Sequence, residues 1–210
     1  MARSCDNRVD AIGQSARGAH QPLASFPDSD CVVCTAAVGC GATVRGDPPW
    51  PTRAMKLSEL IHDKLVELPL RAADKWEALA TIARVPVRAG CYSEELVEEV
   101  ERALVVREKS MTTGMEHGIA IPHAAIDGID DLVAVLGLNP SGIPFETLDG
   151  EPARIVIGLI IPRSKKLAHI KTLAEIAKLL SKAEVRERLL ACSTPSEAVQ
   201  ALAELQGVVR

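Results

Sequence analysis

Three side chains of this sequence are suited to chemistry, and His123 is the first of them. The stretch GMEHGIAIPHAAIDG, residues 114–128, places His123 directly after Pro122 and a short apolar alternation. Pro122 biases Ile121 away from helix and removes a backbone donor, which predicts a histidine held in a turn at the edge of the core. Such an imidazole can present one nitrogen outward as a nucleophile while a carbonyl or side chain holds the other and sets the tautomer. The alternative is a histidine that only fills a turn.

His169 is the second candidate. On a predicted helix it shares a face with Leu173, Ile176 and Leu180, at spacings of four, seven and eleven residues. This pattern predicts an inward-pointing histidine in the first turns of the helix. It is either a core histidine or a second imidazole that converges on His123, near a helix N-terminus whose free N–H groups favour anions.

Arg107 closes another predicted helix, EELVEEVERALVVRE, and continues the apolar stripe of Leu96, Val100 and Ala103. A cation at this end can simply complement the helix dipole. It can instead neutralise a bound phosphate, which arginine does well through bidentate hydrogen bonds.

The elements that must position these side chains alternate between helices and strands. Asp74 with Glu77 three residues later is a helix-start signature, and Thr194, Pro195 and Glu197 form another. The runs DLVAVLGLN and ARIVIGLIIP, closed by Pro140 and Pro162, are typical of buried strands. Further helix caps are predicted at Ser58, Ser93 and Ser164. Interleaved helices and strands predict an α/β domain with helices packed on a sheet.

Composition excludes several classes of function. The 210 residues are 47% hydrophobic and 25% charged, which allows one sizeable core. A formal net charge of −4 and only 2% aromatic residues argue against a nucleic-acid partner. There is no P-loop, so nucleotide binding is not expected. No apolar run approaches the roughly 18 residues that span a bilayer, so we expect no membrane insertion.

Residues 1–54 differ from the rest. They contain four of the six cysteines and lack hydrophobic periodicity, which predicts a disordered tail containing Cys, Pro and Gly. One alternative is a zinc site formed by CVVC with Cys40 and His20, although the second pair of ligands has no regular spacing. Others are a lipoprotein cleavage box at AVGC and a translation start at Met55, where ordered patterning begins. Residues 55–210 are the predicted folded domain.

A family resemblance connects these features. REKSMTTGMEHGIAIPHA, followed by FETLDGEPARIVIGLIIP and HIKTLAEIAKLL, resembles the type-2 enzyme IIA domain of the phosphoenolpyruvate-dependent phosphotransferase system, the fructose, mannitol and nitrogen-regulatory class. The resemblance covers about residues 55–205. It implies a mixed β-sheet sandwiched between helices, with His123 as phosphoryl acceptor, His169 as a second histidine in the same pocket and Arg107 neutralising the phosphate charge. It also implies no cofactor and no metal.

The resemblance implies protein partners on both sides of the transfer. The donor is the phosphorylated carrier protein HPr or its nitrogen-branch relative. Without a fused transporter or IIB-like segment in this sequence, we expect a cytoplasmic phosphocarrier of the nitrogen-regulatory type, in which phosphorylation changes which target protein is bound. The alternative is a sugar-specific relay that passes the phosphoryl group to a fructose- or mannitol-type IIB protein for uptake.

Overall fold

The structure, a computed structural model, describes residues 55–208, without the side chains of residues 166–169 and 207–208. The predicted tail of residues 1–54, with its possible zinc ligands and cleavage box, lies outside the described residues. No helix in the described part of the chain is long and apolar enough to cross a membrane.

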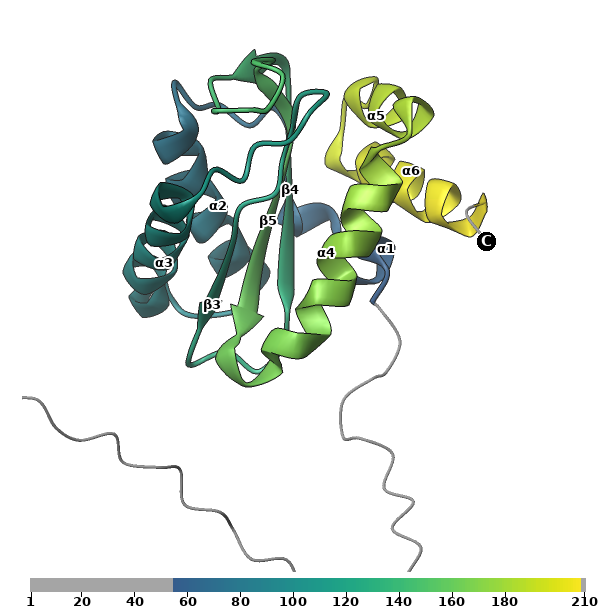
Figure 1. The fold of residues 1–210 in the computed structure, drawn as a ribbon. Coiled ribbons are helices and arrows are strands. Elements are labelled where there is room, and N and C mark those ends of the chain that lie inside the picture. Colours follow the sequence, from purple (N-terminus) through teal and green to yellow (C-terminus); the bar gives the residue numbers. More distant parts are fainter. Residues whose placement is uncertain (1–54, 209–210) are drawn as a thin grey trace, which may run out of the picture. The chain divides into compact units, whose positions relative to one another are not determined.

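A mixed β-sheet of five strands forms the centre of the fold (Figure 1). The strands follow the order β1 (Val66–Glu67), β4 (Val133–Ile143), β5 (Ala153–Pro162) and β2 (Ile119–Ala120), and β3 (His123–Ile126) also pairs with β5. β4 and β5 are antiparallel, whereas the other pairings are parallel. The two long strands are largely buried and apolar, as a sheet covered on both faces requires. The predicted mixed sheet is confirmed.

Helices cover both faces of this sheet (Figure 1). On one side lie α2 (Lys75–Ala89) and α3 (Val97–Ser110), and on the other lie α4 (Lys166–Leu180) and α5 (Ala183–Leu190). The two other α-helices of the described residues, α1 (Leu57–Leu60) and α6 (Pro195–Val208), contact each other. Short 3-10 helices precede β1, α3 and α4: η1 (Asp63–Leu65), η2 (Glu94–Leu96) and η3 (Arg163–Lys165).

Close packing of α2 on the sheet sets the position of the neighbouring α3. Asp74 caps α2 as predicted, because its side chain accepts hydrogen bonds from the backbone N–H groups of Trp76 and Glu77, at 2.9 and 3.0 Å. A Cβ at Gly158 in β5 would overlap the fully buried side chain of Ile82 in α2. Only glycine therefore permits this approach of helix to strand.

The other predicted boundaries are partly wrong. α1 follows Lys56, and the backbone N–H of Ser58 instead donates to Oε1 of Gln206 at 2.7 Å. Ser93 precedes η2 without a side-chain cap, and Ser164 lies within η3. The capping hydroxyl of Thr194 is confirmed, since it accepts from the N–H of Glu197 at 3.3 Å.

The predicted end of one strand is also wrong. β4 does not stop before Pro140 but continues to Ile143, with a register irregularity after Leu138. On the β1 side the ladder has already ended, because β1 pairs only with Leu136 and Gly137. The missing N–H of a proline therefore costs no pairing on that side.

Candidate functional site

The prediction that His123 lies in a turn is wrong, because it is the first residue of β3; its ring is half-buried, at the edge of the core. Its Nδ1 atom lies 2.9 Å from the carbonyl oxygen of Ile121. A carbonyl can only accept, so Nδ1 carries the proton and donates it to this bond. The lone pair of the neutral ring therefore belongs to Nε2.

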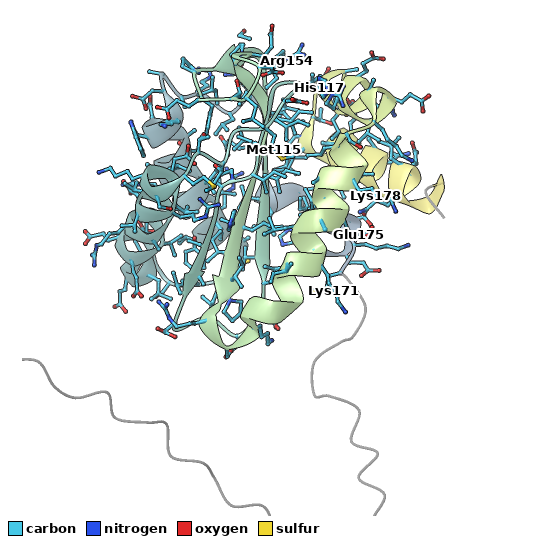
Figure 2. All side chains as sticks on the ribbon, viewed as in Figure 1. Met115, His117, Arg154, Lys171, Glu175 and Lys178 are labelled. Atoms are coloured by element: carbon cyan, nitrogen blue, oxygen red, sulfur yellow. The ribbon has the colours of Figure 1, made fainter. Side chains whose placement is uncertain are left out.

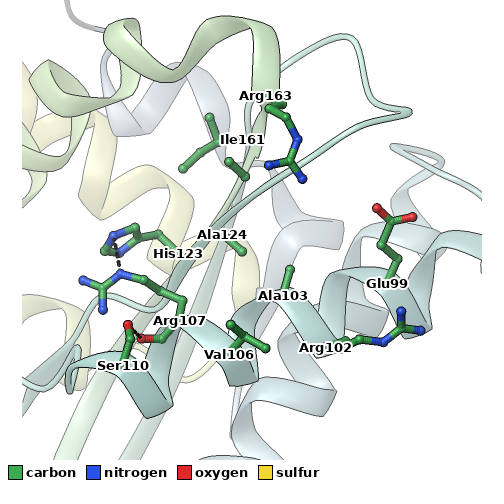
Figure 3. A pocket seen from close by; sticks show the side chains of 11 residues that line it. Glu99, Arg102, Ala103, Val106, Arg107, Ser110, His123, Ala124, Ile161 and Arg163 are labelled. Atoms are coloured by element: carbon green, nitrogen blue, oxygen red, sulfur yellow. Dashed lines mark hydrogen bonds between the residues drawn. The ribbon is translucent and has the colours of Figure 1, made fainter.

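Arg107, in the last turn of α3, faces this lone pair. Its Nε–H donates to Nε2 of His123 at 3.1 Å, a bond visible in Figure 3. One Nη1–H donates to the carbonyl oxygen of Met111 at 2.8 Å, which anchors the guanidinium. The structure thus brings together two of the three side chains singled out from the sequence.

The electrostatic surroundings favour the neutral form of His123. Burial lowers the pKa of His123, and the Arg107 guanidinium lowers it further. The hydrogen bond to Ile121 and the nearby Glu108 carboxylate act in the opposite direction, without reversing the net lowering of the pKa. An imidazole with a lowered pKa is unprotonated on Nε2 at neutral pH, as a nucleophile must be.

His123 and Arg107 line two hollows at once. The larger, about 590 Å³ and here called the α3 hollow, lies between α3 and the strands (Figure 3). The smaller, about 360 Å³ and here called the α4 hollow, separates the same pair from α4. The α3 hollow is further lined by Glu99, Arg102, Ala103, Val106, Ser110, Ala124, Ala125, Ile161 and Arg163. The α4 hollow is further lined by Thr112, Thr113, Gly114, Met115, Ile121, Leu173, Ala174 and Ala177.

His169 lies in the first turns of α4, and its side chain is outside the described part of the structure. Leu173 and Ala177, four and eight residues later, line the α4 hollow. Residues at these spacings share one face of a helix, so the backbone of His169 lies on the face that borders the hollow. Its role stays a prediction.

Two charged residues of the site were missed by the sequence reasoning. Glu108 is buried directly after Arg107, and Arg163 lines the α3 hollow while its Nε–H donates to Asp127 at 2.8 Å. A signal for Glu108 was present, because it lies four residues after Leu104 on the buried face of α3. Arg163 follows the end of a buried strand and carried no comparable signal.

The loop before His123 presents polar residues at the surface near α4. Figure 2 labels Met115 and His117 of this loop and Arg154 of β5, with Lys171, Glu175 and Lys178 along α4. His117 is exposed and adopts a positive φ of 66°. Its N–H donates to Oδ2 of Asp149 at 2.6 Å. Within residues 55–208, no cluster of His, Cys, Asp and Glu side chains is arranged to hold a metal ion.

Comparison with known proteins gives one consistent family. Residues 59–205 match the family model described as "Phosphoenolpyruvate-dependent sugar phosphotransferase system, EIIA 2". A nitrogen regulatory protein of Pseudomonas aeruginosa is 36% identical over 143 residues, which covers 68% of this chain and 90% of that protein. The fructose-specific EIIABC component of the Bacillus subtilis phosphotransferase system is 28% identical over 136 residues, or 65% of this chain, and the match spans only 21% of that protein.

Solved structures share the fold. The nitrogen regulatory protein IIA-Ntr from Neisseria meningitidis superimposes with a TM-score of 0.63 at 23% identity, covering 69% of this chain and 97% of that one. Escherichia coli IIA mannitol, solved in complex with phosphorylated IIB mannitol, gives a TM-score of 0.58 at 26% identity, with the same coverage. The arrangement of sheet and helices is thus one already seen in both sugar and nitrogen-regulatory IIA proteins.

Proposed function

Because the chain belongs to the EIIA type-2 family of the phosphoenolpyruvate-dependent sugar phosphotransferase system, we propose that Nε2 of His123 is its phosphoryl acceptor. The family consists of phosphoryl-transfer components, so the chain is a phosphocarrier. The observation that supports His123 is its fixed tautomer. Nδ1–H is held by Ile121, the Nε2 lone pair faces the Arg107 guanidinium, and His123 lines both hollows.

The transfer needs positioning and charge neutralisation rather than a covalent cofactor. The Nε2 lone pair attacks the phosphorus of a phosphohistidine on the donor protein, and the donor's P–N bond breaks as the new one forms. Arg107 releases Nε2 at this moment. Its anchor at Met111 keeps the guanidinium nearby, where its N–H groups neutralise the phosphoryl oxygens.

The bond to Ile121 also supports the onward transfer. Attack through Nε2 leaves the ring of His123 positively charged, with Nδ1–H still donating to the carbonyl. A carbonyl oxygen favours the protonated form of the nitrogen it faces, since two lone pairs would repel. When the P–N bond breaks, the cationic ring leaves as a neutral imidazole, which is a good leaving group, so the phosphoryl group remains transferable to the next protein.

His169 is proposed as the second histidine of the same pocket, donating to a phosphoryl oxygen from α4. Its backbone position on the face of α4 that borders the α4 hollow supports this role. His169 also lies in the first turns of α4, where the positive end of the helix dipole favours an anion.

We propose an HPr-type phosphocarrier as donor, and a cytoplasmic location where such donors are charged from phosphoenolpyruvate. The acceptor depends on the branch. The 36% identity to a nitrogen regulatory protein favours the regulatory type, in which phosphorylated His123 alters binding to a target protein. The alternative, a sugar relay to a IIB protein, is supported by the similarity to the fructose-specific component and to IIA mannitol, whose complex contains phosphorylated IIB.

A transfer assay tests the proposal. The purified chain is incubated with labelled phosphoenolpyruvate, enzyme I and an HPr-type donor, and the label is expected as an alkali-stable, acid-labile phosphohistidine. His123→Ala should take up no label, whereas His169→Ala should take it up more slowly. Label on His123→Ala combined with none on His169→Ala would reverse the assigned roles. Loss of label to an added cognate IIB protein would favour the relay, and its retention would favour the regulator.

A further inference from the structure

Glu108 is a buried carboxylate that the mechanism above does not use. Its side chain has an exposed fraction of 0%, and it lies in α3 next to Arg107. Oε2 accepts two hydrogen bonds from Thr113, from the backbone N–H at 2.9 Å and from Oγ1–H at 2.5 Å. The hydroxyl of Thr112 shares its one proton between Oε1 at 3.2 Å and the carbonyl oxygen of Glu146 at 2.6 Å, and Nζ of Lys75 lies 3.6 Å from Oε1.

A continuous chain of hydrogen bonds leads from this carboxylate to the ring of His123. Glu108 fixes the peptide of Thr113 through the two bonds just described. The carbonyl oxygen of Thr113 accepts from the N–H of Ile121 at 3.0 Å. The carbonyl oxygen of Ile121 accepts from Nδ1 of His123 at 2.9 Å. The N–H of Ile121 is therefore held by Thr113, and its C=O is used by the imidazole.

We propose that Glu108 is a positioning residue for His123, which holds Thr113 and thereby Ile121 where the Ile121 carbonyl selects the Nδ1–H tautomer. The inference rests on the proposed function of His123 and deepens it. No hydrogen bond joins Glu108 to the ring. Its charge raises the pKa of His123, and its effect on the tautomer runs through the two backbone links.

The energetics favour a specific role over simple packing. Burying a carboxylate is costly unless donors surround it, and apolar residues of similar volume often stabilise such a position equally well. Here the two donors of Thr113, which is only 7% exposed, and the charge of Lys75 offset the cost. Without Glu108, the Thr113 N–H and hydroxyl would lose their acceptor in a place that water scarcely reaches. The loop would then reorganise, and the Ile121 carbonyl with it.

The test compares Glu108→Leu with Glu108→Gln in the full chain, with Leu189→Ala in α5 as a control. Leucine fills the buried volume but accepts no hydrogen bond, whereas glutamine keeps an oxygen for the Thr113 N–H. Leu189 is fully buried far along the chain, so its truncation lowers stability without touching this chain of bonds. The ¹⁵N shifts of labelled His123 report the tautomer, and unfolding in urea reports stability.

The second readout is the rate of phosphorylation by phosphoramidate, a small donor that needs no partner protein. Nε2 of His123 forms the new P–N bond as the P–N bond of the donor breaks. The nitrogen of phosphoramidate is already protonated and leaves as ammonia. Misplacement of a reacting group by about an ångström costs up to roughly a hundredfold in rate. Glu108→Leu should therefore react about ten- to a hundredfold more slowly and show a mixture of tautomers, whereas Glu108→Gln should stay within about threefold of the native rate.

The outcomes separate this inference from the proposed function. An unchanged tautomer and rate in Glu108→Leu, with only stability altered as in Leu189→Ala, would overturn the positioning role. If Glu108→Leu does not fold, Thr113→Val serves instead, because it removes the hydrogen bond from the Thr113 hydroxyl to Glu108. An unchanged His123 tautomer in that variant would also overturn the positioning role. Failure of the proposed function shows differently, as phosphorylation of His123→Ala, while the tautomer of His123 remains measurable by NMR.

Discussion

Replacing Arg107 with methionine should move two properties of His123 in opposite directions. The guanidinium lowers the pKa of the imidazole, so its removal should raise that pKa. In the proposed mechanism the same change removes the cation that neutralises the phosphoryl group, so phosphorylation should slow down. A residue that only packed against the histidine would not produce this combination.

The size of the rate effect follows from the hydrogen bonds of Arg107. Two of the five N–H groups of the guanidinium are engaged, one with Nε2 of His123 and one with Met111, and the others can reach phosphoryl oxygens. Hydrogen bonds to a charged group contribute about 1.5–3 kcal/mol. Loss of one such bond in the transition state slows the reaction by about 10- to 150-fold.

The assay is the rate of phosphorylation by phosphoramidate as a function of pH, together with an NMR titration of His123. In the proposed mechanism the neutral imidazole is the nucleophile, so the rate should rise as pH increases through the pKa of His123 and then level off. With a raised pKa, Arg107→Met should show its largest deficit on the acidic side and a smaller, constant deficit at high pH. Lys109→Met removes a cation from the same helix, one that lies 5.8 Å from the Trp76 ring, and should leave both curves unchanged. A lower pKa of His123 in Arg107→Met, or a native rate, would refute the reasoning.

Three further predictions concern the scaffold. Asp74→Ala removes the cap that accepts two backbone N–H groups of α2 and should lower the free energy of unfolding in urea by about 1 kcal/mol. Gly158→Ala places a Cβ against the side chain of Ile82 and should lower the free energy of unfolding by about 1–3 kcal/mol in the same assay. Gly114→Ala is not a control for this contact, because its Cβ would also overlap a neighbour, the backbone of Glu146. Residues 55–210 expressed alone should keep the melting temperature of the folded domain and the native rate of phosphorylation, and a loss of either would show that residues 1–54 take part.

The central strands could be predicted from the sequence because their signal is local. Continuous apolar runs such as ARIVIGLIIP indicate buried strands, and β5 begins and ends with this run. The end of β4 could not be predicted in this way. Proline normally stops a central strand, but Pro140 lies where the short β1 no longer pairs. Whether a neighbouring strand still pairs at the position of Pro140 depends on the sheet topology. The local sequence pattern carries no information about that topology.

The candidate site shows the same limit. Arg107 was placed near the core from its spacing on the helix, and the structure puts it at the edge of the buried stripe, against His123. The stripe itself runs through Val100 and Leu104 to Glu108. A glutamate at that position suggests the exposed end of a helix when only the local sequence is considered. The residue that compensates its buried charge, Lys75, belongs to α2 and is distant in sequence. Partners of buried charges are non-local, so sequence spacing alone does not find them.

Pro122 explains how an edge strand can serve chemistry. β2 and β3 pair with β5 in one register on either side of it, so the two short strands are one edge strand interrupted at the proline. Successive residues of a strand direct their N–H and C=O groups to opposite sides. Pro122 uses its carbonyl toward β5, accepting from Leu159 at 2.9 Å, and Ile121 therefore directs both its groups away from the sheet. In a fully paired strand those groups would belong to a neighbour. At this edge they are available to Thr113 and to Nδ1 of His123, and the tautomer of the proposed phosphoryl acceptor is thus set by the backbone two residues before it.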